Sequence, residues 1–373
     1  MKCVAKDLLL MGLLLMGSMT VLGQRLTQSG LDAERFDSVM DGRKTGLYVI
    51  ANRQGMEACV TNYGARLVSL VYDGKDRVIG FDNVGDYRRF RQNYGATVGR
   101  YVGRIKGARF TLDGQEHHLQ ENGKGVTSHG GYPGFADRIW TVTQQTDSTV
   151  TLQYVSADGE NGFPGELTVR LTYWVSDRNG LEVSYEATTT KPTVLNLTNH
   201  SFFNISGRLE REITDETLWV NSDRIAEFDA QKNVTGRLLK VKGTPFDFRK
   251  ARRIGERIDD DDAQLQVTKG YDHSFVLKTK GSDRKPAAIV SDRESRTHMT
   301  VYTTEPVLHI YTGNGLKGNT RGKHDIYYPR RSAVCLEAMH LADSPNQPQF
   351  PSTVLRPGQT FRSHTAFVFS KIE

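Results

Sequence analysis

Residues 165–187 alternate apolar and polar side chains with a period of two, and this constrains the fold more than any other feature of the chain. From Leu167 to Val175 every second residue is apolar, and polar residues or Trp174 stand between them. A Ser-Asp-Arg-Asn-Gly turn follows at 176–180, and the alternation resumes from Leu181 to Ala187. This pattern is typical of two half-buried antiparallel strands, so the segment is predicted to form a hairpin.

The rest of the chain indicates the same class of structure. Short strands are predicted near 47–52, 56–62, 66–72, 148–155, 298–303, 307–312, 333–337 and 365–371, with Gly, Asn, Asp and Pro between them. Short helices are expected at most at 86–92 and 249–258, and no alternation of strands with helices is seen. Gly313–Gly318 matches a dinucleotide-binding fingerprint as text, but no helical pattern follows it. The prediction is therefore an all-β fold, a large antiparallel β-sandwich, in a single domain spanning 24–373.

The first 23 residues read as a secretory signal peptide. Lys2 and Lys6 precede an apolar run from Leu8 to Leu15, and small residues follow as far as Gly23. We expect export to a bacterial periplasm, with no stable membrane anchor once the segment is removed. The net charge of +6 becomes +5 without this segment, which carries two lysines and one aspartate. The basic residues are not clustered, so nucleic acid is excluded as an expected partner.

The cysteines and the acidic residues say less about disulfide bonds and bound ions. Cys59 and Cys335 lie in apolar, strand-like runs and are expected to be small core residues, and the sequence leaves their pairing open. Asp259–Asp262 is the densest run of charge. We interpret it as a solvated loop, and a calcium ion held there is a secondary hypothesis.

The first candidate for chemistry is His200, in the segment Asn196-Leu-Thr-Asn-His-Ser-Phe-Phe. Apolar and β-branched residues precede it, so it is placed where a strand runs into a loop. By itself the pattern also fits a histidine that is hydrogen-bonded within the structure. Four other segments carry residues suited to the same chemistry, and this favours a functional role.

Those segments contribute one candidate each. Arg104 follows closely spaced glycines and offers several fixed donors to ligand oxygens. His129 precedes two glycines that would let a ligand approach the backbone. Asp272, at a turn before a strand, could accept hydrogen bonds from hydroxyl groups or cap its own turn. Glu337 ends a largely apolar strand, where a carboxylate is costly to bury, so it is a candidate base with a shifted pKa or one half of a salt bridge.

At these positions the chain resembles the aldose 1-epimerase (galactose mutarotase) family. The motifs follow the family's order over essentially the whole chain: Gly99-Arg-Tyr-x-x-Arg104-Ile, His129-Gly-Gly, Asn196-x-Thr-Asn-His200, Gly270-Tyr-Asp272-His, Tyr311-Thr-Gly-Asn314, and Leu336-Glu337 before Asp343-Ser-Pro-Asn346. Three positions depart from the family pattern, namely Phe202 for tyrosine, Gly103 for asparagine, and Met339 in front of His340 where glutamine is frequent. None of them removes a catalytic group.

The resemblance implies a β-sandwich of the galactose mutarotase type and a free aldohexose as substrate. It makes Glu337 the general base and His200 the general acid of ring opening, and it gives Arg104, His129 and Asp272 the binding of sugar hydroxyls. No cofactor or metal is needed for this chemistry. We expect a monomer or weak dimer, and a bell-shaped pH profile from a protonated His200 and an ionised Glu337.

Three alternatives remain at this point. A non-catalytic sugar-binding protein on the same fold would need neither His200 nor Glu337. A glycoside hydrolase would use a carboxylate pair such as Glu337 and Asp272, and would leave His200 without a role. An epimerase of hexose 6-phosphates would need an additional basic cluster, for which Arg330-Arg331 is the candidate.

Overall fold

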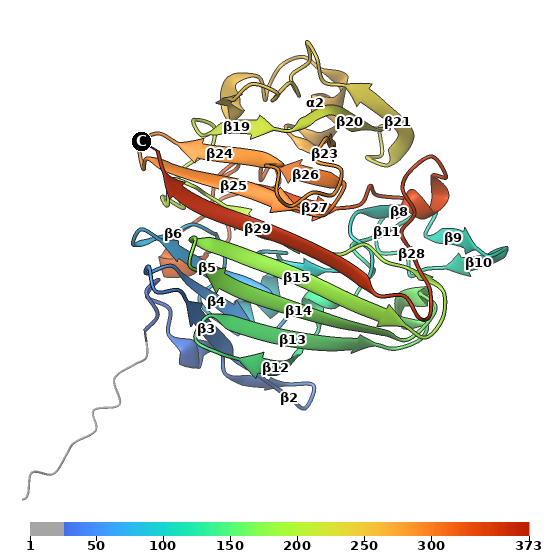
Figure 1. Ribbon diagram of the computed structural model, residues 1–373, viewed down its shortest axis with the longest axis horizontal. Coiled ribbons are helices and arrows are strands. Elements are labelled where there is room, and N and C mark those ends of the chain that lie inside the picture. The colour runs from blue at the N-terminus through green and yellow to red at the C-terminus, as the bar shows by residue number, and fades with distance from the viewer. Residues whose placement is uncertain (1–25, 373) are drawn as a thin grey trace, which may run out of the picture.

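A nine-stranded antiparallel sheet forms one layer of the computed structural model, which describes residues 26–372 (Figure 1). The signal peptide predicted at 1–23 lies outside the described residues. In sheet order the strands are β12 (Thr141–Gln145), β13 (Thr149–Ser156), β14 (Leu167–Ser176), β15 (Gly180–Thr189), β29 (Phe361–Lys371), β25 (Thr297–Thr303), β24 (Ala288–Asp292), β19 (Thr217–Val220) and β22 (Arg252–Arg253). No helix among the described residues has the length and apolar character needed to cross a membrane.

The predicted hairpin forms the third and fourth strands of this sheet. β14 and β15 pair in one continuous register, with Leu171 opposite Tyr185. Leu171 is fully buried, whereas Trp174 on the opposite face is 46% exposed. The period of two therefore places one face of the hairpin in the core and the other in solvent, and the prediction is confirmed.

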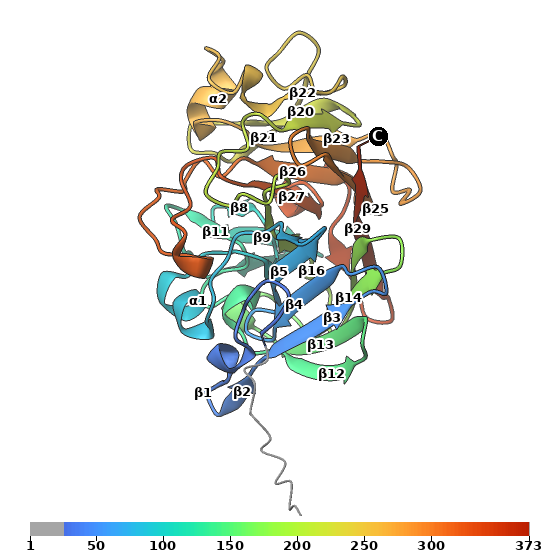
Figure 2. The ribbon, with the colours of Figure 1, turned by 90° about the vertical axis from the view of Figure 1, so that its left-hand side faces the viewer.

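The second layer consists of two smaller sheets. The six-stranded sheet has the order β18 (Phe202–Phe203), β27 (Val334–Met339), β26 (Val307–Tyr311), β23 (Asp272–Leu277), β20 (Ser222–Phe228) and β21 (Val234–Lys240), and the four-stranded sheet has β3 (Leu47–Ala51), β4 (Glu57–Thr61), β5 (Arg66–Tyr72) and β6 (Lys75–Asp76). Figure 2 shows β3, β4 and β5 side by side below β20, β23, β26 and β27.

Apolar side chains from both layers form one core. Phe203 of β18 and Phe367 of β29 meet with ring centroids 4.8 Å apart. Buried residues of β3, β4 and β5 belong to the same cluster as those of β14 and β15. The two layers bury their facing surfaces against each other, which confirms the predicted all-β sandwich.

Short strand pairs add segments to this framework. β17 (Thr198–His200) pairs with β7 (Ala96–Val98), and β8 (Arg104–Lys106) pairs with β11 (Val126–Ser128). The other pairs are β1 (Ser38–Met40) with β2 (Arg43–Thr45), β9 (Arg109–Leu112) with β10 (Gln115–His118), and β16 (Thr193–Val194) with β28 (Val354–Leu355). The α-helices of the described residues are α1 (Val84–Phe90) and α2 (Ala263–Thr268).

The observed helices differ from the predicted ones at two places. The expected helix at 249–258 is wrong, because that segment contains β22 and a single 3-10 turn, Ile254–Glu256. α2 was not predicted, since six residues are too few to show a helical period, and its start depends on Asp262, which accepts hydrogen bonds from the backbone N–H groups of Gln264 and Leu265. No α-helix follows Gly313–Gly318 in the described part of the chain, as expected; the next helical segment is a 3-10 turn, Lys323–Asp325. Cys59 and Cys335 are both buried, and neither forms a disulfide with another described residue.

Candidate functional site

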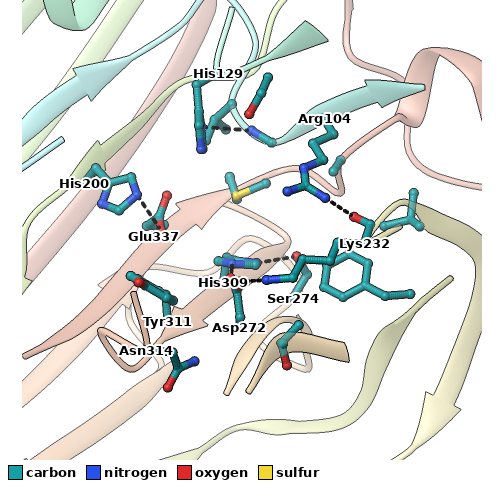
Figure 3. Close-up of a pocket in the computed structure, with 18 of the residues that line it drawn as sticks. Arg104, His129, His200, Lys232, Asp272, Ser274, His309, Tyr311, Asn314 and Glu337 are labelled. Atoms are coloured by element: carbon teal, nitrogen blue, oxygen red, sulfur yellow. Dashed lines mark hydrogen bonds and ion pairs between the residues drawn. The ribbon is translucent and has the colours of Figure 1, made fainter. Parts of the chain in front are cut away.

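Three neighbouring strands of the six-stranded sheet provide the floor of one cavity. His309 of β26 lies opposite Glu337 of β27, and Ser274 of β23 lies opposite His309. Directly paired residues point to the same face of a sheet. Asp272 is two residues from Ser274 on β23 and therefore shares that face. Residues from far apart in the chain are brought together here by strand register (Figure 3).

His200 approaches Glu337 from outside this sheet. It ends β17, and β17 is fixed to β27 where the hydroxyl of Thr198 donates to the carbonyl of Ala338 at 2.9 Å. The Nε2 atom of His200 lies 3.4 Å from Oε1 of Glu337. The imidazole stacks on the ring of Phe202, with centroids 5.0 Å apart. The structure thus brings together the two residues predicted to carry the proton transfers, although 137 positions separate them in the chain.

His129 and Arg104 line the wall of the cavity that faces Asp272 and His309 (Figure 3). Ser128 at the end of β11 pairs with Arg104 on β8, and His129 follows at once. The His129 and His200 ring centroids are 5.9 Å apart. The glycine after His129 is required sterically, since a Cβ on Gly130 would lie 2.1 Å from the carbonyl oxygen of Gly99 and its φ is +85°.

Arg104 has protein partners as well as a place in the cavity wall. Its Nη1 donates to the carbonyl of Gln231 at 2.8 Å and to that of Lys232 at 3.1 Å. These carbonyls belong to the turn between β20 and β21. Arg104 therefore ties this turn to the wall of the cavity, an interaction that the sequence pattern did not indicate.

Asp272 is held by a histidine that the sequence analysis did not select. His309 Nε2 donates to Oδ1 of Asp272 at 2.9 Å, and His309 Nδ1 is hydrogen-bonded to the hydroxyl of Ser274, also at 2.9 Å. Lys232 Nζ is 3.8 Å from the other oxygen of Asp272. The sequence shows His309 only as a single polar residue within the apolar segment Val307-Leu-His-Ile-Tyr311. Its role follows from its position opposite Glu337 in the sheet, which the sequence does not give.

All five predicted site residues line one cavity of about 490 Å³. Its polar lining also includes His309, Lys232, Ser274, Tyr311 and Asn314, and apolar side chains such as Phe228 and Met339 complete the wall. This mixture of apolar surface with a few convergent polar groups is typical of a small-molecule site.

Burial disfavours the charged forms of both residues in the central pair. Burial raises the pKa of Glu337 to about 7, and the positive charge of His309 opposes that rise. Burial, together with His129 and His309, lowers the pKa of His200 to about 3. Between about pH 3 and pH 7 the pair therefore holds one shared proton, and that proton resides on the carboxyl group.

The second pair behaves in the opposite way. Burial disfavours the imidazolium of His309, but the hydrogen bond and charge of Asp272 outweigh it, so the pKa of His309 is raised. Burial would raise the pKa of Asp272, but His309 and Lys232 lower it overall. His309 and Asp272 therefore form an ion pair beside the neutral pair of His200 and Glu337. Burial is also the largest cause of the lowered pKa of His129, about 4, so His129 is neutral.

The acidic run 259–262 lies outside this cavity, and its carboxylates have protein partners. Asp259 pairs with Arg331, Asp260 accepts from Arg257 at 2.8 Å, and Asp261 accepts from Gln266. Asp262 caps α2. Among the described residues, one group of three potential metal ligands has its ligand atoms within 4.8 Å of one another, and it consists of His200, Cys335 and Glu337.

Comparison with known proteins places the chain among sugar-converting enzymes. A family model described as aldose 1-epimerase matches residues 46–368. Galactose mutarotase of Rattus norvegicus is 40% identical over 295 residues, covering 79% of this chain and 84% of that protein. Aldose 1-epimerase of Escherichia coli K12 is 36% identical over 337 residues, covering 88% of this chain and 96% of that protein.

Solved structures agree with the sequence comparison. An aldose epimerase homologue from C. elegans matches with a TM-score of 0.82 at 28% identity, covering 88% of this chain and 100% of that one. The galactose 1-epimerase of Lactobacillus acidophilus matches with a TM-score of 0.81 at 27% identity, covering 90% of this chain and 97% of that one. These matches confirm the predicted β-sandwich of the galactose mutarotase type.

Proposed function

Since this chain belongs to the aldose 1-epimerase family and is an isomerase acting on carbohydrates, we propose that Glu337 and His200 carry its reaction on free aldohexoses. The family, the fold and the mutarotase activity predicted from the sequence are confirmed by these relatives. Neither of the two alternatives on the same fold, a non-catalytic binding protein and a hydrolase, gains support. The residue roles, the preferred sugar and the location of the protein are the proposal.

The reaction needs two coordinated proton transfers. A base takes the proton of the hydroxyl on C1, an acid protonates the ring oxygen, and the ring opens to an aldehyde. Rotation about the C1–C2 bond and reclosure on the other carbonyl face give the second anomer. Both oxygens are bonded to C1 and are therefore close together, so the acid and the base must also be neighbours. The 3.4 Å separation of His200 and Glu337 is the observation that carries the assignment.

The single proton of the pair defines the active form. In the sugar-free enzyme it resides on Glu337, because burial disfavours both charges. Moving it to His200 produces the protonated acid and ionised base that the reaction needs, without changing the proton count. A bound sugar favours this arrangement, because its C1 hydroxyl donates to the carboxylate and its ring oxygen accepts from the imidazolium.

The other predicted residues position the sugar. We assign Asp272 to a sugar hydroxyl, with His309 and Lys232 keeping the carboxylate ionised. His129 offers a neutral imidazole on the opposite wall. Arg104 contributes through its guanidinium and by holding the turn at Gln231 and Lys232 in place. Their contribution is to hold the sugar while the aldehyde rotates.

No cofactor is part of the proposal, because the reaction consists of proton transfers and a bond rotation. A calcium ion at 259–262 would have to replace the arginine and glutamine partners of Asp259, Asp260 and Asp261 and the cap that Asp262 provides. The acidic run is therefore assigned a structural role. The substrate is taken to be a small free sugar, and a monomer or weak dimer is retained as the expected state.

Two variants test the residue roles. Glu337→Gln and His200→Asn should each lower kcat by about 10²-fold or more, since each removes one partner of acid–base catalysis. Glu182→Gln, a buried carboxylate in the other layer, and His298→Asn, a histidine of β25, are the matched controls and should stay near the wild-type rate. Polarimetry on freshly dissolved single anomers of galactose and glucose measures all four and also identifies the preferred sugar. Near-normal activity of either site variant would refute its role.

We also propose that the protein is exported. Support comes from the apolar run Leu8–Leu15 behind Lys2 and Lys6. Cell fractionation and N-terminal sequencing test this proposal: the mature chain should begin near Gln24, outside the cytoplasm. Recovery only in the cytoplasm with residues 1–23 intact would contradict it.

A further inference from the structure

Cys335 lies directly beneath the proposed acid–base pair. It is two residues before Glu337 on β27, so both side chains point to the same face of the sheet. Its strand neighbours are Phe202 and Tyr311, and its side chain is fully buried. The mechanism proposed above gives this thiol no part. Its position next to a histidine and a carboxylate therefore calls for a separate explanation.

The three side chains match the ligand types of a thiophilic divalent metal ion. Zinc in proteins is bound by thiolate, imidazole and carboxylate groups, usually in a tetrahedron. Their ligand atoms in this structure all lie within 4.8 Å of one another. The usual zinc–ligand bonds of about 2.0 Å to nitrogen and oxygen imply a nitrogen–oxygen separation of about 3.3 Å in a tetrahedron. The observed separation of Nε2 of His200 and Oε1 of Glu337 is 3.4 Å.

Two further features suit metal binding. Nδ1 of His200 is buried and has no hydrogen-bond partner among the described residues, so no hydrogen bond at that atom resists a small reorientation of the ring. Both His200 and Glu337 line the cavity, whereas Cys335 lies behind them. An ion entering from the cavity would therefore meet the imidazole and carboxylate first and the sulfur at the back. Its fourth position would face the cavity.

We propose that His200, Cys335 and Glu337 form a binding site for one thiophilic divalent cation, such as Zn²⁺ or Cd²⁺, and that this ion inhibits the enzyme. The Cys335 S–H bond breaks, its proton is released to solvent and the sulfur binds the ion as a thiolate. Glu337 also gives up the proton on its carboxyl group to solvent and binds as the carboxylate, and His200 binds through a nitrogen lone pair. Inhibition follows because the ion occupies both proposed catalytic groups and competes with the sugar. This last point depends on the proposed function, whereas binding itself does not.

Cadmium titration of the intact protein tests the site directly. Thiolate coordination gives an ultraviolet charge-transfer band, and wild type should develop this band with one ion per chain while losing activity in parallel. Cys335→Ala should retain activity without metal, show no band and require at least tenfold more cadmium for inhibition. Cys59→Ala is the matched control, since Cys59 is also free and buried but is not part of the group, and it should behave as wild type.

The pH dependence gives a second readout. Because the thiol proton is released on binding, the apparent affinity for cadmium should rise with pH in wild type and in Cys59→Ala. Cys335→Ser serves as a second variant in case the alanine variant does not fold, and it should also lack the band. An unchanged cadmium response in either folded Cys335 variant would overturn the proposal, as would the absence of a band in active wild type. A wild-type band on Cys335 together with near-normal activity of Glu337→Gln or His200→Asn would instead refute the proposed residue roles and leave the metal site intact.

Discussion

His309→Gln should extend the activity of this enzyme to higher pH, although it removes a charged group from the site. In wild type the active pair holds one proton, and the pKa of Glu337 at about 7 marks its loss. The rate constant kcat/KM should therefore be level below neutral pH and fall about tenfold per pH unit above pH 7. Because the His200 pKa is about 3, the acid limb lies near that value.

The size of the shift follows from the position of His309. It lies directly opposite Glu337 in the sheet, which places the two charges roughly 6 Å apart. At an effective dielectric constant of about 20, such a pair interacts by about 3 kcal/mol, equivalent to about two pH units. The cation of His309 favours loss of the shared proton, so its removal makes that proton harder to lose. The alkaline limb should move upward by about one to two units.

Polarimetric kcat/KM values across the pH range, corrected for the spontaneous reaction at each pH, measure this limb. Loss of the hydrogen bond to Asp272 should lower the plateau of His309→Gln, but it does not change the sign of the shift. His298→Gln is the control and should keep the wild-type limb. A limb that stays in place or moves to lower pH would refute the electrostatic role of His309. A wild-type rate that instead rises through pH 7 would mean that Glu337 acts as a lone base, and the shared-proton mechanism would be wrong.

Three other variants test the site and its support. Glu216→Gln should increase stability most at alkaline pH, because burial raises the pKa of Glu216 to about 8. The stabilising contribution of protonated Glu216 is complete below about pH 4.5 and is lost as the pH rises through 8. Thermal melts of both proteins across this range measure the difference. Leu171→Ala should lower the free energy of unfolding by about 2–5 kcal/mol, because it opens a cavity in the sandwich core, and denaturant titration would contradict this with an unchanged midpoint. Arg104→Met should raise KM more than it lowers kcat, since it releases the turn at Gln231 and Lys232, and a loss confined to kcat in steady-state kinetics would argue against that positioning role.

Much of the site could be predicted from the sequence because its motifs are local. The segments around His200, Arg104, His129, Asp272 and Glu337 each allow a structural reading alone, but together, in the family's order, they could be recognised. The structure places all five around one cavity. The partners of these residues could not be predicted in the same way. Arg104 bonds to two carbonyls from the turn at 231–232, and no pattern in the sequence connects these segments.

His309 shows the same limit more clearly. A single histidine in a short apolar strand gives no indication of function until its register against Glu337 is known. Its charge state also depends on Asp272, which reaches it from β23. The pKa values of the site follow from burial and from these contacts, so the distribution of protons could not be derived from residue types alone.

The amino-acid sequence by itself determined the strands and the face that each buries, because a period of two assigns alternate side chains to core and solvent wherever the strand lies. It also supplied the chemical groups of the reaction in recognisable segments. Only the tertiary structure decided which strands are neighbours, and in what register. Backbone hydrogen bonds between distant segments set that register, and these bonds bring an imidazole, a thiol and two carboxylates from three strands to one site.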